Sequence, residues 1–412
     1  MIPIPLDDVR PLGRVEGDAA EVTGVKIDSR RIEPGDLFVA VRGGVNHLDE
    51  ARARGAAATL VPENEFAALA ALGRGVRERS RAEVVGITGS TGKTSTKDIL
   101  AALVRPHRRT VAAEASFNAE LGVPLTLARL EPDTEVLIAE LAMRGFGQIA
   151  ALCAIARPTL GVITTIGPVH LEFVESVEGV ARAKAEVLEA LPPDAKAVVP
   201  AAANELAPHI PAGLDVIRVG EDARLVSFED GRVELDVGGT RATVATPFRA
   251  LHQAENTLTA AAAYWALGLP LERIGDGAND IELSRLRGEE LPLEGGGVLI
   301  NDCWNANPAS MTAALTDLTS RNGGRRLAVL GGMAELGPDG PRYHREIAAL
   351  TSDLDAVVGV GELARDYDPT HWVPDADAAA TLLRDLLEPG DIVLVKGSRS
   401  VGLERVAQNV VG

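Results

Sequence analysis

A glycine-rich segment is the part of the sequence whose residue types and spacing best suit chemistry. Residues 89–95 read Gly-Ser-Thr-Gly-Lys-Thr-Ser and lie between a strand-like run, "VVGIT", and a helix-like run, "KTSTKDILAALV". Glycines let backbone N–H groups approach phosphate oxygens, and the amino end of a helix adds partial positive charge. Lys93 would neutralise the β- and γ-phosphates of a nucleotide, and the Thr94 hydroxyl would bind Mg²⁺. The predicted nucleotide-binding residues are Gly89, Ser90, Thr91, Gly92, Lys93, Thr94 and Ser95.

The match to the common phosphate-loop pattern is incomplete. Ile87 occupies the position of its first glycine, although Gly86 and Gly89 flank that place. The strand, the remaining glycines and the Lys-Thr pair nevertheless stand in the expected order. We therefore predict nucleotide binding rather than a simple glycine-rich turn.

Two polar residues follow neighbouring strand-like runs. Glu140 ends "VLIAE", and His170 follows "GVITTIG". Ligands of open parallel sheets collect at the carboxyl ends of strands, so both residues are expected beside the phosphates. A carboxylate suits Mg²⁺, and an imidazole can complete its coordination shell or orient a water. Each residue alone is also explained as an ordinary strand end or loop residue.

Lys184 lies on the apolar face of a predicted helix. The segment "SVEGVARAKAEVLEAL" begins with Ser176 as a helix N-cap. Helical periodicity places Lys184 in a stripe of otherwise apolar residues and turns Arg182 and Glu186 outward. A buried lysine is unfavourable unless it is paired with a negative charge, neutralised or used in a reaction. Its aliphatic stem could also extend so that the charged end reaches solvent. In either case Lys184 needs a partner.

Composition limits the class of protein. The chain has 412 residues, 46% of them hydrophobic, which predicts two or three globular domains. Its formal charge of −18 argues against a general nucleic-acid binder. Two distant cysteines, Cys153 and Cys303, indicate neither a disulfide framework nor a zinc cluster. The amino terminus does not resemble a signal peptide, and no run has membrane-spanning length, so we expect a cytoplasmic protein without membrane insertion.

Three regions differ in their pattern of predicted elements. Residues 1–78 mix short strands with turns, and residues 79–283 alternate strands and helices before a polar, β-rich insertion. The alternation returns in residues 284–412. This pattern predicts an α/β protein of three domains, with a parallel sheet in the central one.

Two other classes of function remain open at this level. A nucleotide-dependent switch or kinase would explain the phosphate loop, but it would leave Lys184 and the third region unexplained. A dehydrogenase is suggested by "VVGVGELA", in which Gly359, Gly361 and Ala364 imitate a dinucleotide-binding pattern. The acidic residues downstream come a little early for that pattern.

Eight segments together resemble the Mur ligase family in their order and spacing. They are "TGSTGKTSTK", "FNAELGVPLTL", "ELAMRGFGQIA", "GVITTIGPVHLE", "ARAKAEVL", "NDCWNANPASM", "GGMAELG" and "VLVKGSR". The resemblance spans nearly the whole chain and is strongest to the branch that joins D-alanyl-D-alanine to UDP-N-acetylmuramoyl-tripeptide. It implies a UDP-sugar domain, a central ATPase domain and a C-terminal Rossmann-like domain in a monomeric, ATP- and Mg²⁺-dependent enzyme that proceeds through an acyl phosphate.

The resemblance also implies roles for individual residues. Lys184 corresponds to a lysine that CO₂ carbamylates, and the implied Mg²⁺ ligands are Thr94, Glu140, His170 and the modified Lys184. Asn256 is placed at adenine and Asp302 at the ribose, while Arg287 is the interdomain arginine unless Arg285 takes that place. The implied substrate residues are Ser29, Arg30, Asn46 and His47 for the UDP-sugar and Asn305, Lys396, Ser398 and Arg399 in the C-terminal domain.

The sequence departs from the family pattern at several positions. Trp304 replaces a tyrosine, Gly332 an aspartate and Ala119 an asparagine, and residues 45–47 read Val-Asn-His where Asp-Gly-His is usual. Several of these positions lie where substrates rather than ATP are held. A ligase of this family with a different acid or amine, such as one that adds an amino acid or amidates a cofactor, therefore remains the alternative.

Overall fold

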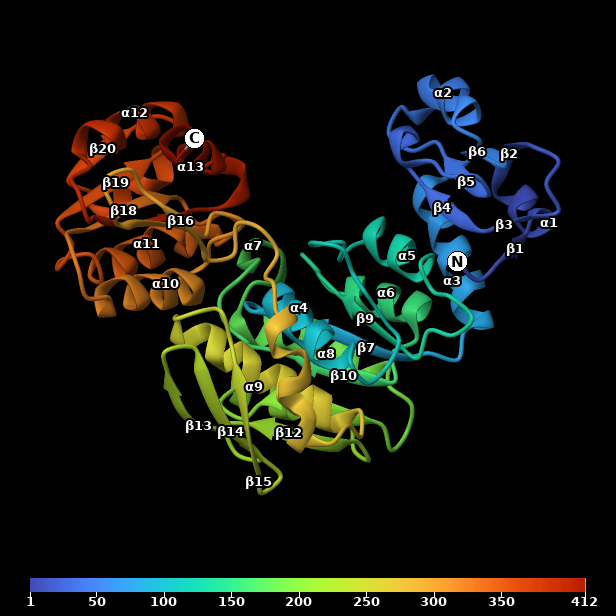
Figure 1. Cartoon of the computed structure of the whole chain (residues 1–412), viewed down its shortest axis with the longest axis horizontal. Coiled ribbons are helices and arrows are strands. Elements are labelled where there is room, and N and C mark those ends of the chain that lie inside the picture. The colour runs from blue at the N-terminus through green and yellow to red at the C-terminus, as the bar shows by residue number, and fades with distance from the viewer. Residues whose placement is uncertain (412) are drawn as a thin grey trace.

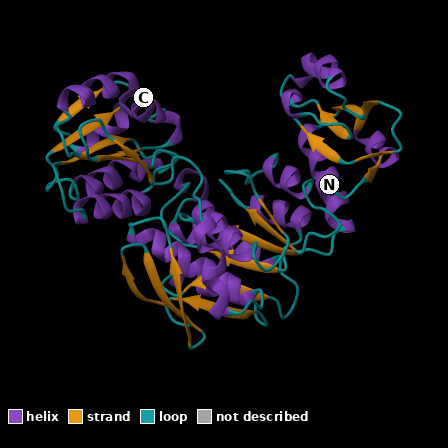
Figure 2. Ribbon diagram, in the orientation of Figure 1, coloured by secondary structure: helices purple, strands orange, loops and turns teal. Residues whose placement is uncertain are grey.

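The computed structural model describes residues 1–411 and consists of three α/β units that follow one another along the chain (Figure 1). Helices and strands alternate in the central and C-terminal units, as the sequence pattern predicts (Figure 2). The predicted fold class is confirmed. The predicted limits 1–78, 79–283 and 284–412 stay predictions; residue 78 lies in the last turn of α3, and residue 283 lies between the 3₁₀ helix Leu271–Asp280 and β16.

The N-terminal unit contains two small sheets. One pairs β1 with β3 antiparallel, and the other has the strand order β2-β6-β5-β4, in which β6, β5 and β4 are parallel. The strands are β1 (Ile4–Pro5), β2 (Gly13–Glu16), β3 (Glu21–Val22), β4 (Gly24–Lys26), β5 (Asp36–Val39) and β6 (Ala58–Pro62). The helices are α1 (Leu6–Val9), α2 (Leu48–Ala53) and α3 (Glu65–Arg79).

The central unit is built on a nine-stranded sheet of order β15-β14-β13-β12-β11-β10-β7-β9-β8. Strands β7 to β12 are parallel. The polar insertion forms the antiparallel strands β13 to β15 at one edge of the sheet. The strands are β7 (Glu83–Thr88), β8 (Thr110–Ala112), β9 (Val136–Glu140), β10 (Leu160–Ile163), β11 (Lys196–Pro200), β12 (Asp215–Val219), β13 (Ala223–Glu229), β14 (Arg232–Val237) and β15 (Thr240–Ala245). The helices are α4 (Lys93–Val104), α5 (Gly122–Leu127), α6 (Gln148–Ala156), α7 (Leu171–Val174), α8 (Val177–Glu189) and α9 (Leu251–Ala266).

The C-terminal unit has a six-stranded sheet of order β16-β17-β21-β18-β19-β20, parallel except for β16 at the edge. Its strands are β16 (Glu289–Pro292), β17 (Val298–Asn301), β18 (Arg326–Gly331), β19 (Ala356–Val360), β20 (His371–Val373) and β21 (Ile392–Lys396). Its helices are α10 (Pro308–Ser320), α11 (Gly340–Ala348), α12 (Ala376–Leu386) and α13 (Glu404–Val411).

Helices cover both faces of the central sheet, which is why its strands are apolar on both sides. Val84 of β7 packs in the core formed with α5, α6 and α8, whereas Val85 and Ile87 pack in the core formed with α4 and α9. All three side chains are fully buried. The carboxyl ends of β7, β9 and β10 consequently open onto loops, where polar residues can face a ligand.

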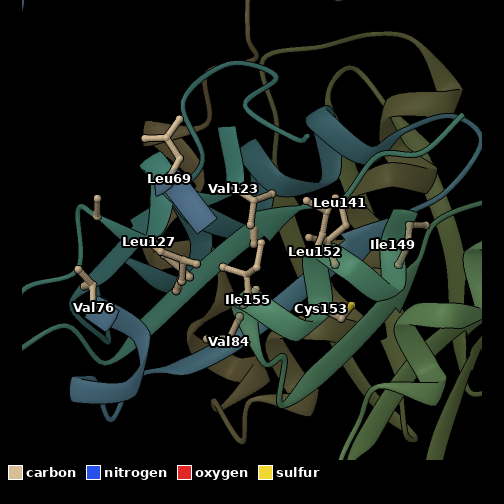
Figure 3. Packing of buried hydrophobic residues seen from close by; sticks show 14 of the residues in the cluster. Leu69, Val76, Val84, Val123, Leu127, Leu141, Ile149, Leu152, Cys153 and Ile155 are labelled. Atoms are coloured by element: carbon tan, nitrogen blue, oxygen red, sulfur yellow. The ribbon is translucent and has the colours of Figure 1, made fainter. Parts of the chain in front are cut away.

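Helix α3 joins the N-terminal unit to the central core. Leu69 and Val76 of α3 lie against Val123 and Leu127 of α5 (Figure 3). Gly73 permits this contact, because a Cβ atom there would lie 2.8 Å from the Cα atom of Pro124. The two units therefore share one hydrophobic cluster, which fixes the direction in which the N-terminal unit leaves the central one.

Local predictions agree with the structure except at one side chain. Ser176 caps α8, as predicted, by accepting a hydrogen bond from the Gly179 N–H. Arg182 is exposed as expected, but Glu186 is half-buried and accepts hydrogen bonds from the N–H groups of Gly147 and Ala150. The outward direction predicted for Glu186 is thus wrong, because its carboxylate caps α6. No helix within residues 1–411 is long and apolar enough to cross a membrane.

Candidate active site

The predicted phosphate loop connects the end of β7 to the first residue of α4. Gly92 has a φ of 79° and Gly89 a φ of 149°, conformations that other residues rarely adopt. A Cβ atom on Gly92 would also lie 2.3 Å from the Oδ1 atom of Asn256. Lys93 donates a hydrogen bond of 2.7 Å from Nζ to the Gly89 carbonyl oxygen. Within residues 1–411 no side chain caps the amino end of α4, which leaves its N–H groups for an anion.

The loop is braced by the segment that follows β10. The Ser90 N–H donates to the carbonyl oxygen of Thr165 at 2.9 Å, and the Ser90 hydroxyl donates to the carbonyl oxygen of Gly167 at 3.1 Å. The Thr91 N–H donates to the Thr165 hydroxyl at 2.9 Å. These bonds hold the first half of the loop in place before any nucleotide binds.

Glu140 and Arg287 meet at the Thr94 hydroxyl. Glu140 is 1% exposed at the end of β9, and its Oε2 atom accepts a hydrogen bond of 2.9 Å from Thr94 Oγ1. Its Oε1 atom accepts a hydrogen bond of 2.8 Å from Asn118 Nδ2. Arg287 donates from Nη2 to Thr94 Oγ1 at 3.1 Å. Arg285, by contrast, is exposed and lines a neighbouring cavity, so Arg287 is the arginine that reaches the phosphate loop.

Lys184 is buried on the inner face of α8, as the helical periodicity predicts. Its side chain is 1% exposed, and it forms neither a hydrogen bond nor an ion pair with any other residue in the range 1–411. Burial lowers the pKa of Lys184 well below its ordinary value, and the positive charge of Lys93 acts in the same direction. Burial therefore disfavours the charged ammonium form, and Lys184 lacks the partner that a buried cation requires.

His170 lies at the amino end of α7 in a left-handed conformation, with a φ of 55°. Its Nδ1 atom is 2.5 Å from Oε2 of Glu335, a residue of the C-terminal unit that also pairs with Arg144 at 3.1 Å. Burial lowers the pKa of His170, the Glu335 carboxylate opposes this shift, and the charge of Lys184 adds to it. Because a carboxylate only accepts hydrogen bonds, Nδ1 carries the proton and Nε2 remains free as a ligand atom.

One cavity of about 1140 Å³ brings most of the predicted site together. The predicted residues that line it belong to the central and C-terminal units: Ser90, Thr91, Gly92, Lys93, Thr94, Ser95, Glu140, His170, Asn256, Arg287, Asp302, Asn305 and Lys396. Gly89, Lys184, Ser398 and Arg399 do not line it. The cavity therefore connects the phosphate loop with the C-terminal unit.

A buried ion pair closes the C-terminal side of this cavity. Lys396 is 2% exposed, and its Nζ atom lies 2.6 Å from Oδ2 of Asp302. It also donates a hydrogen bond of 3.1 Å to the carbonyl oxygen of Asn305. The resemblance implies separate ligands for Asp302 and Lys396, but the fold places them in direct contact.

Trp304 lies between two arginines that belong to different parts of the predicted site. The guanidinium carbon of Arg287 is 5.7 Å from the centre of the Trp304 ring, and that of Arg399 is 5.3 Å from it. Ser398 is buried and accepts a hydrogen bond of 2.9 Å from the Ala334 N–H. Ser398 is thus engaged in holding the loop that leads to Glu335.

The predicted UDP-sugar residues form a separate group in the N-terminal unit. Ser29 donates a hydrogen bond of 2.7 Å to Oε2 of Glu50, and His47 Nδ1 is 3.4 Å from the same oxygen. The hydrogen bond from Ser29 lowers the pKa of Glu50. Asn46 is exposed beside His47, whereas Arg30 is occupied by a bidentate pairing with Asp28. Glu50 therefore organises two of the four predicted residues.

The implied Mg²⁺ site lacks a ready-made cluster of ligands. Within residues 1–411 no group of three or more His, Cys, Asp or Glu side chains is placed to hold a metal ion. The residues fit Mg²⁺ in another way, since Glu140 and Thr94 would offer it oxygen atoms beside the phosphate loop and a bound nucleotide would supply phosphate oxygens. Carbamylation would make Lys184 an anionic oxygen ligand and remove its unfavourable burial as an amine.

Asn118 and Glu335 are contacts of the site that sequence reasoning missed. Asn118 lies within the quoted segment "FNAELG", but no local pattern indicates that its amide reaches Glu140. Glu335 lies 165 positions from His170 in the chain. The first contact depends on packing within the central unit and the second on packing between two units, and neither leaves a periodic signal in the sequence.

The fold and the site together define an amide-forming ligase of the Mur type, and the chain belongs to the Mur ligase family. Residues 87–264 match the Mur ligase middle domain, and residues 287–399 match the Mur ligase glutamate ligase domain. A UDP-N-acetylmuramoyl-tripeptide–D-alanyl-D-alanine ligase from Synechocystis sp. is 32% identical over 95% of this chain and 92% of the relative.

Solved structures give the same result over the whole chain. MurF from Acinetobacter baumannii has a TM-score of 0.87 at 26% identity and covers 99% of both chains. MurF from Thermotoga maritima in complex with ADP has a TM-score of 0.82 at 27% identity, covering 94% of this chain and 96% of the other.

Proposed function

We propose that the chain is an ATP-dependent, ADP-forming ligase that joins D-alanyl-D-alanine to UDP-N-acetylmuramoyl-tripeptide during peptidoglycan precursor synthesis. The observation that carries the proposal is the cavity in which the phosphate loop, Glu140 and Arg287 face residues of the C-terminal unit. A relative named for this reaction aligns with 95% of the chain. We place the reaction in the cytoplasm and assign it to a monomer, with small molecules as the only partners.

The reaction must activate a carboxylate, because an acid and an amine do not condense spontaneously in water. The terminal carboxylate of the UDP-linked peptide attacks the γ-phosphorus of ATP, which gives an acyl phosphate and ADP. The dipeptide amine then attacks the acyl carbon, and the tetrahedral intermediate loses a proton and expels phosphate. Lys93, Arg287 and the amino end of α4 would stabilise the negative charge of the migrating phosphoryl group.

The metal site is assigned to Thr94, Glu140, His170 and carbamylated Lys184. When bound there, Mg²⁺ would neutralise the negative charge of the phosphates. Lys184 is suited to the modification because burial favours its neutral amine form, and that form reacts with CO₂ to give a carbamate and a proton. Glu335 would fix the His170 ring so that Nε2 faces the site.

The remaining predicted residues are assigned to substrates. Asn256, which contacts Gly92 of the loop, is placed at adenine, and Asp302 at the ribose. We assign Ser29, Arg30, Asn46 and His47 to the UDP-sugar and Asn305, Lys396, Ser398 and Arg399 to the C-terminal substrate site. Closure of the units around the cavity would bring the amine to the acyl phosphate and exclude water.

Packing accounts for one departure from the family pattern. A Cβ atom on Gly332 would lie 2.5 Å from the Cβ atom of Leu363, so the usual aspartate does not fit there. Trp304 and Ala119 line the cavity, where they could change the choice of acid or amine. A Mur-type ligase with a different substrate pair therefore remains the second candidate.

Glu335→Gln is expected to weaken the metal site without disrupting the nucleotide loop. Loss of the carboxylate leaves the His170 ring less firmly oriented, so activity should fall about 10- to 100-fold at limiting Mg²⁺. Titrating Mg²⁺ in the turnover assay measures this effect. Glu404→Gln, which loses its contact with Arg399 instead, is the control. Equal Mg²⁺ dependence in the Glu335→Gln variant and the unchanged enzyme would contradict the assignment.

Phosphate release from ATP tests the function directly. We expect release only when UDP-N-acetylmuramoyl-tripeptide and D-alanyl-D-alanine are both present, together with a UDP-pentapeptide product identified by its mass. Turnover with other acid and amine pairs but not with this one would favour the second candidate. Absence of amine-dependent release with every pair would refute the ligase function.

A further inference from the structure

The second turn of α4 carries a charged pair that the proposed mechanism does not use. Lys97 is 1% and Asp98 13% exposed, and Lys97 Nζ lies 2.7 Å from Asp98 Oδ1. Neither side chain lines the cavity of the site. Burial of two charges is costly, and a well-packed apolar pair is often as stable, so stability alone is a weak reason for this pair.

Lys97 binds the loop in which Asn118 lies. Its Nζ atom donates hydrogen bonds of 2.7 Å and 2.9 Å to the carbonyl oxygens of Ala113 and Ala115. Ala115 is in a left-handed conformation with a φ of 44°, which for alanine needs support from its surroundings. Three residues later, Asn118 donates to Glu140, and its carbonyl oxygen accepts a hydrogen bond of 2.8 Å from the Ala142 N–H.

Asp98 binds the segment in which Arg287 lies. Its second oxygen, Oδ2, accepts a hydrogen bond of 2.8 Å from the Ser284 N–H. Ser284 lies three positions before Arg287 in the connection between the central and C-terminal units, and Arg287 donates to Thr94 Oγ1 at 3.1 Å. Thr94 belongs to the first turn of the same helix, one turn before Lys97 and Asp98.

We propose that Lys97 and Asp98 are positioning residues that fix Asn118 and Arg287 relative to the phosphate loop. The pair acts as a common anchor for two segments. One segment carries Asn118, which contacts Glu140, and the other carries Arg287, which contacts Thr94, so both contacts meet at the Thr94–Glu140 hydrogen bond. Movement of the connection at Ser284 would thereby be transmitted to the nucleotide site through Arg287. This inference rests on the proposed ligase function for its kinetic consequences but not for its structural ones.

The kinetic test compares Asp98→Ala with Arg287→Met in a double-mutant cycle. Asp98→Ala should lower kcat about 10- to 100-fold, as loss of outer-shell contacts does, with little change in the KM for ATP. In the Arg287→Met background the same substitution should have almost no further effect, because the group that it positions is already missing. An equal loss of kcat in both backgrounds would overturn the proposal.

Lys97→Met tests the other arm, with Lys196→Met as its matched control. Lys196 also donates to a backbone carbonyl oxygen, that of Ala266 at 3.2 Å, but lies outside the cavity. Lys97→Met should lower kcat about tenfold or more, whereas Lys196→Met should not. A fall in Tm with unchanged kcat would assign Lys97 a structural role only. Asp98→Leu, which has a similar shape but no acceptor oxygen for the Ser284 N–H, replaces Asp98→Ala if the alanine variant does not fold.

Hydrogen exchange separates this proposal from the proposed function. Lys97→Met should speed amide exchange in residues 113–118, and Asp98→Ala should speed it in residues 284–287, both relative to Lys196→Met. This measurement needs no turnover, so it still decides the positioning role if the unchanged protein shows no ligase activity with any substrate pair. Unchanged exchange in both segments would overturn the proposal.

Discussion

Replacing Lys184 by alanine is expected to lower ATP-dependent ligation by about 10³-fold, the scale on which loss of a preorganised charge acts in an active site. The Lys184 side chain is almost fully buried, and its amine lies near Lys93 and His170. A carbamate would turn this amine into an anionic ligand, which the positive charge of the neighbouring Lys93 favours. Alanine can form no carbamate, and so the variant loses the ligand.

Rescue distinguishes a carbamate from a merely structural lysine. Removing the long side chain leaves space in which acetate or formate could supply the missing carboxylate, so these anions should restore part of the activity. Acetate should not restore Lys93→Ala, which lacks a cation rather than an anion. Depleting CO₂ should also inactivate the unchanged enzyme reversibly. Full activity of Lys184→Ala, or indifference of the unchanged enzyme to CO₂, would refute the carbamate.

Arg287→Met is expected to lower kcat by about 10³-fold, because an arginine that stabilises a transferring phosphoryl group contributes at least this much in related reactions. Arg287 reaches the phosphate loop from the connection between two units and touches Thr94. Burial lowers the pKa of Arg287, and the Glu140 and Asp302 carboxylates oppose that shift, so the guanidinium stays charged.

Arg285→Met is the matched control for this prediction. Arg285 lies two positions earlier, is exposed and does not line the cavity that holds the phosphate loop. Its substitution should leave kcat nearly unchanged, and the binding of ADP should be similar in both variants. Equal losses in the two variants would refute the assignment of Arg287 as the interdomain arginine. Loss of activity in Arg285→Met alone would transfer that role to Arg285.

Several parts of the site were predictable because their cause is local. The phosphate loop follows from glycines, a lysine and a hydroxyl at fixed offsets between a strand and a helix. The burial of Lys184 follows from helical periodicity, and the cap at Ser176 follows from a serine placed directly before the helix. Each of these features involves residues within about one helical turn of one another, so their sequence pattern carries the geometry.

The contacts between residues that are far apart in the sequence could not be predicted in this way. Sequence resemblance left Arg285 and Arg287 as alternatives, and only the path of the connecting segment brings Arg287 to Thr94 across 193 positions. The outward prediction for Glu186 failed for the same reason, because α6 packs beside α8 and offers its amino end to the carboxylate. Asp302 and Lys396 likewise meet because β17 and β21 are neighbours in the sheet.

The sequence by itself determined which segments can bind phosphate, which helix buries a lysine and that the chain folds into α/β domains. Only the tertiary structure decided which partners complete the site: Asn118 and Thr94 for Glu140, Glu335 for His170, and Arg287 for the phosphate loop. Local patterns arise from the backbone repeat of helices and strands, which spans a few residues. Partners separated by tens to hundreds of positions are selected by sheet order and by the packing of whole units, which no local pattern records.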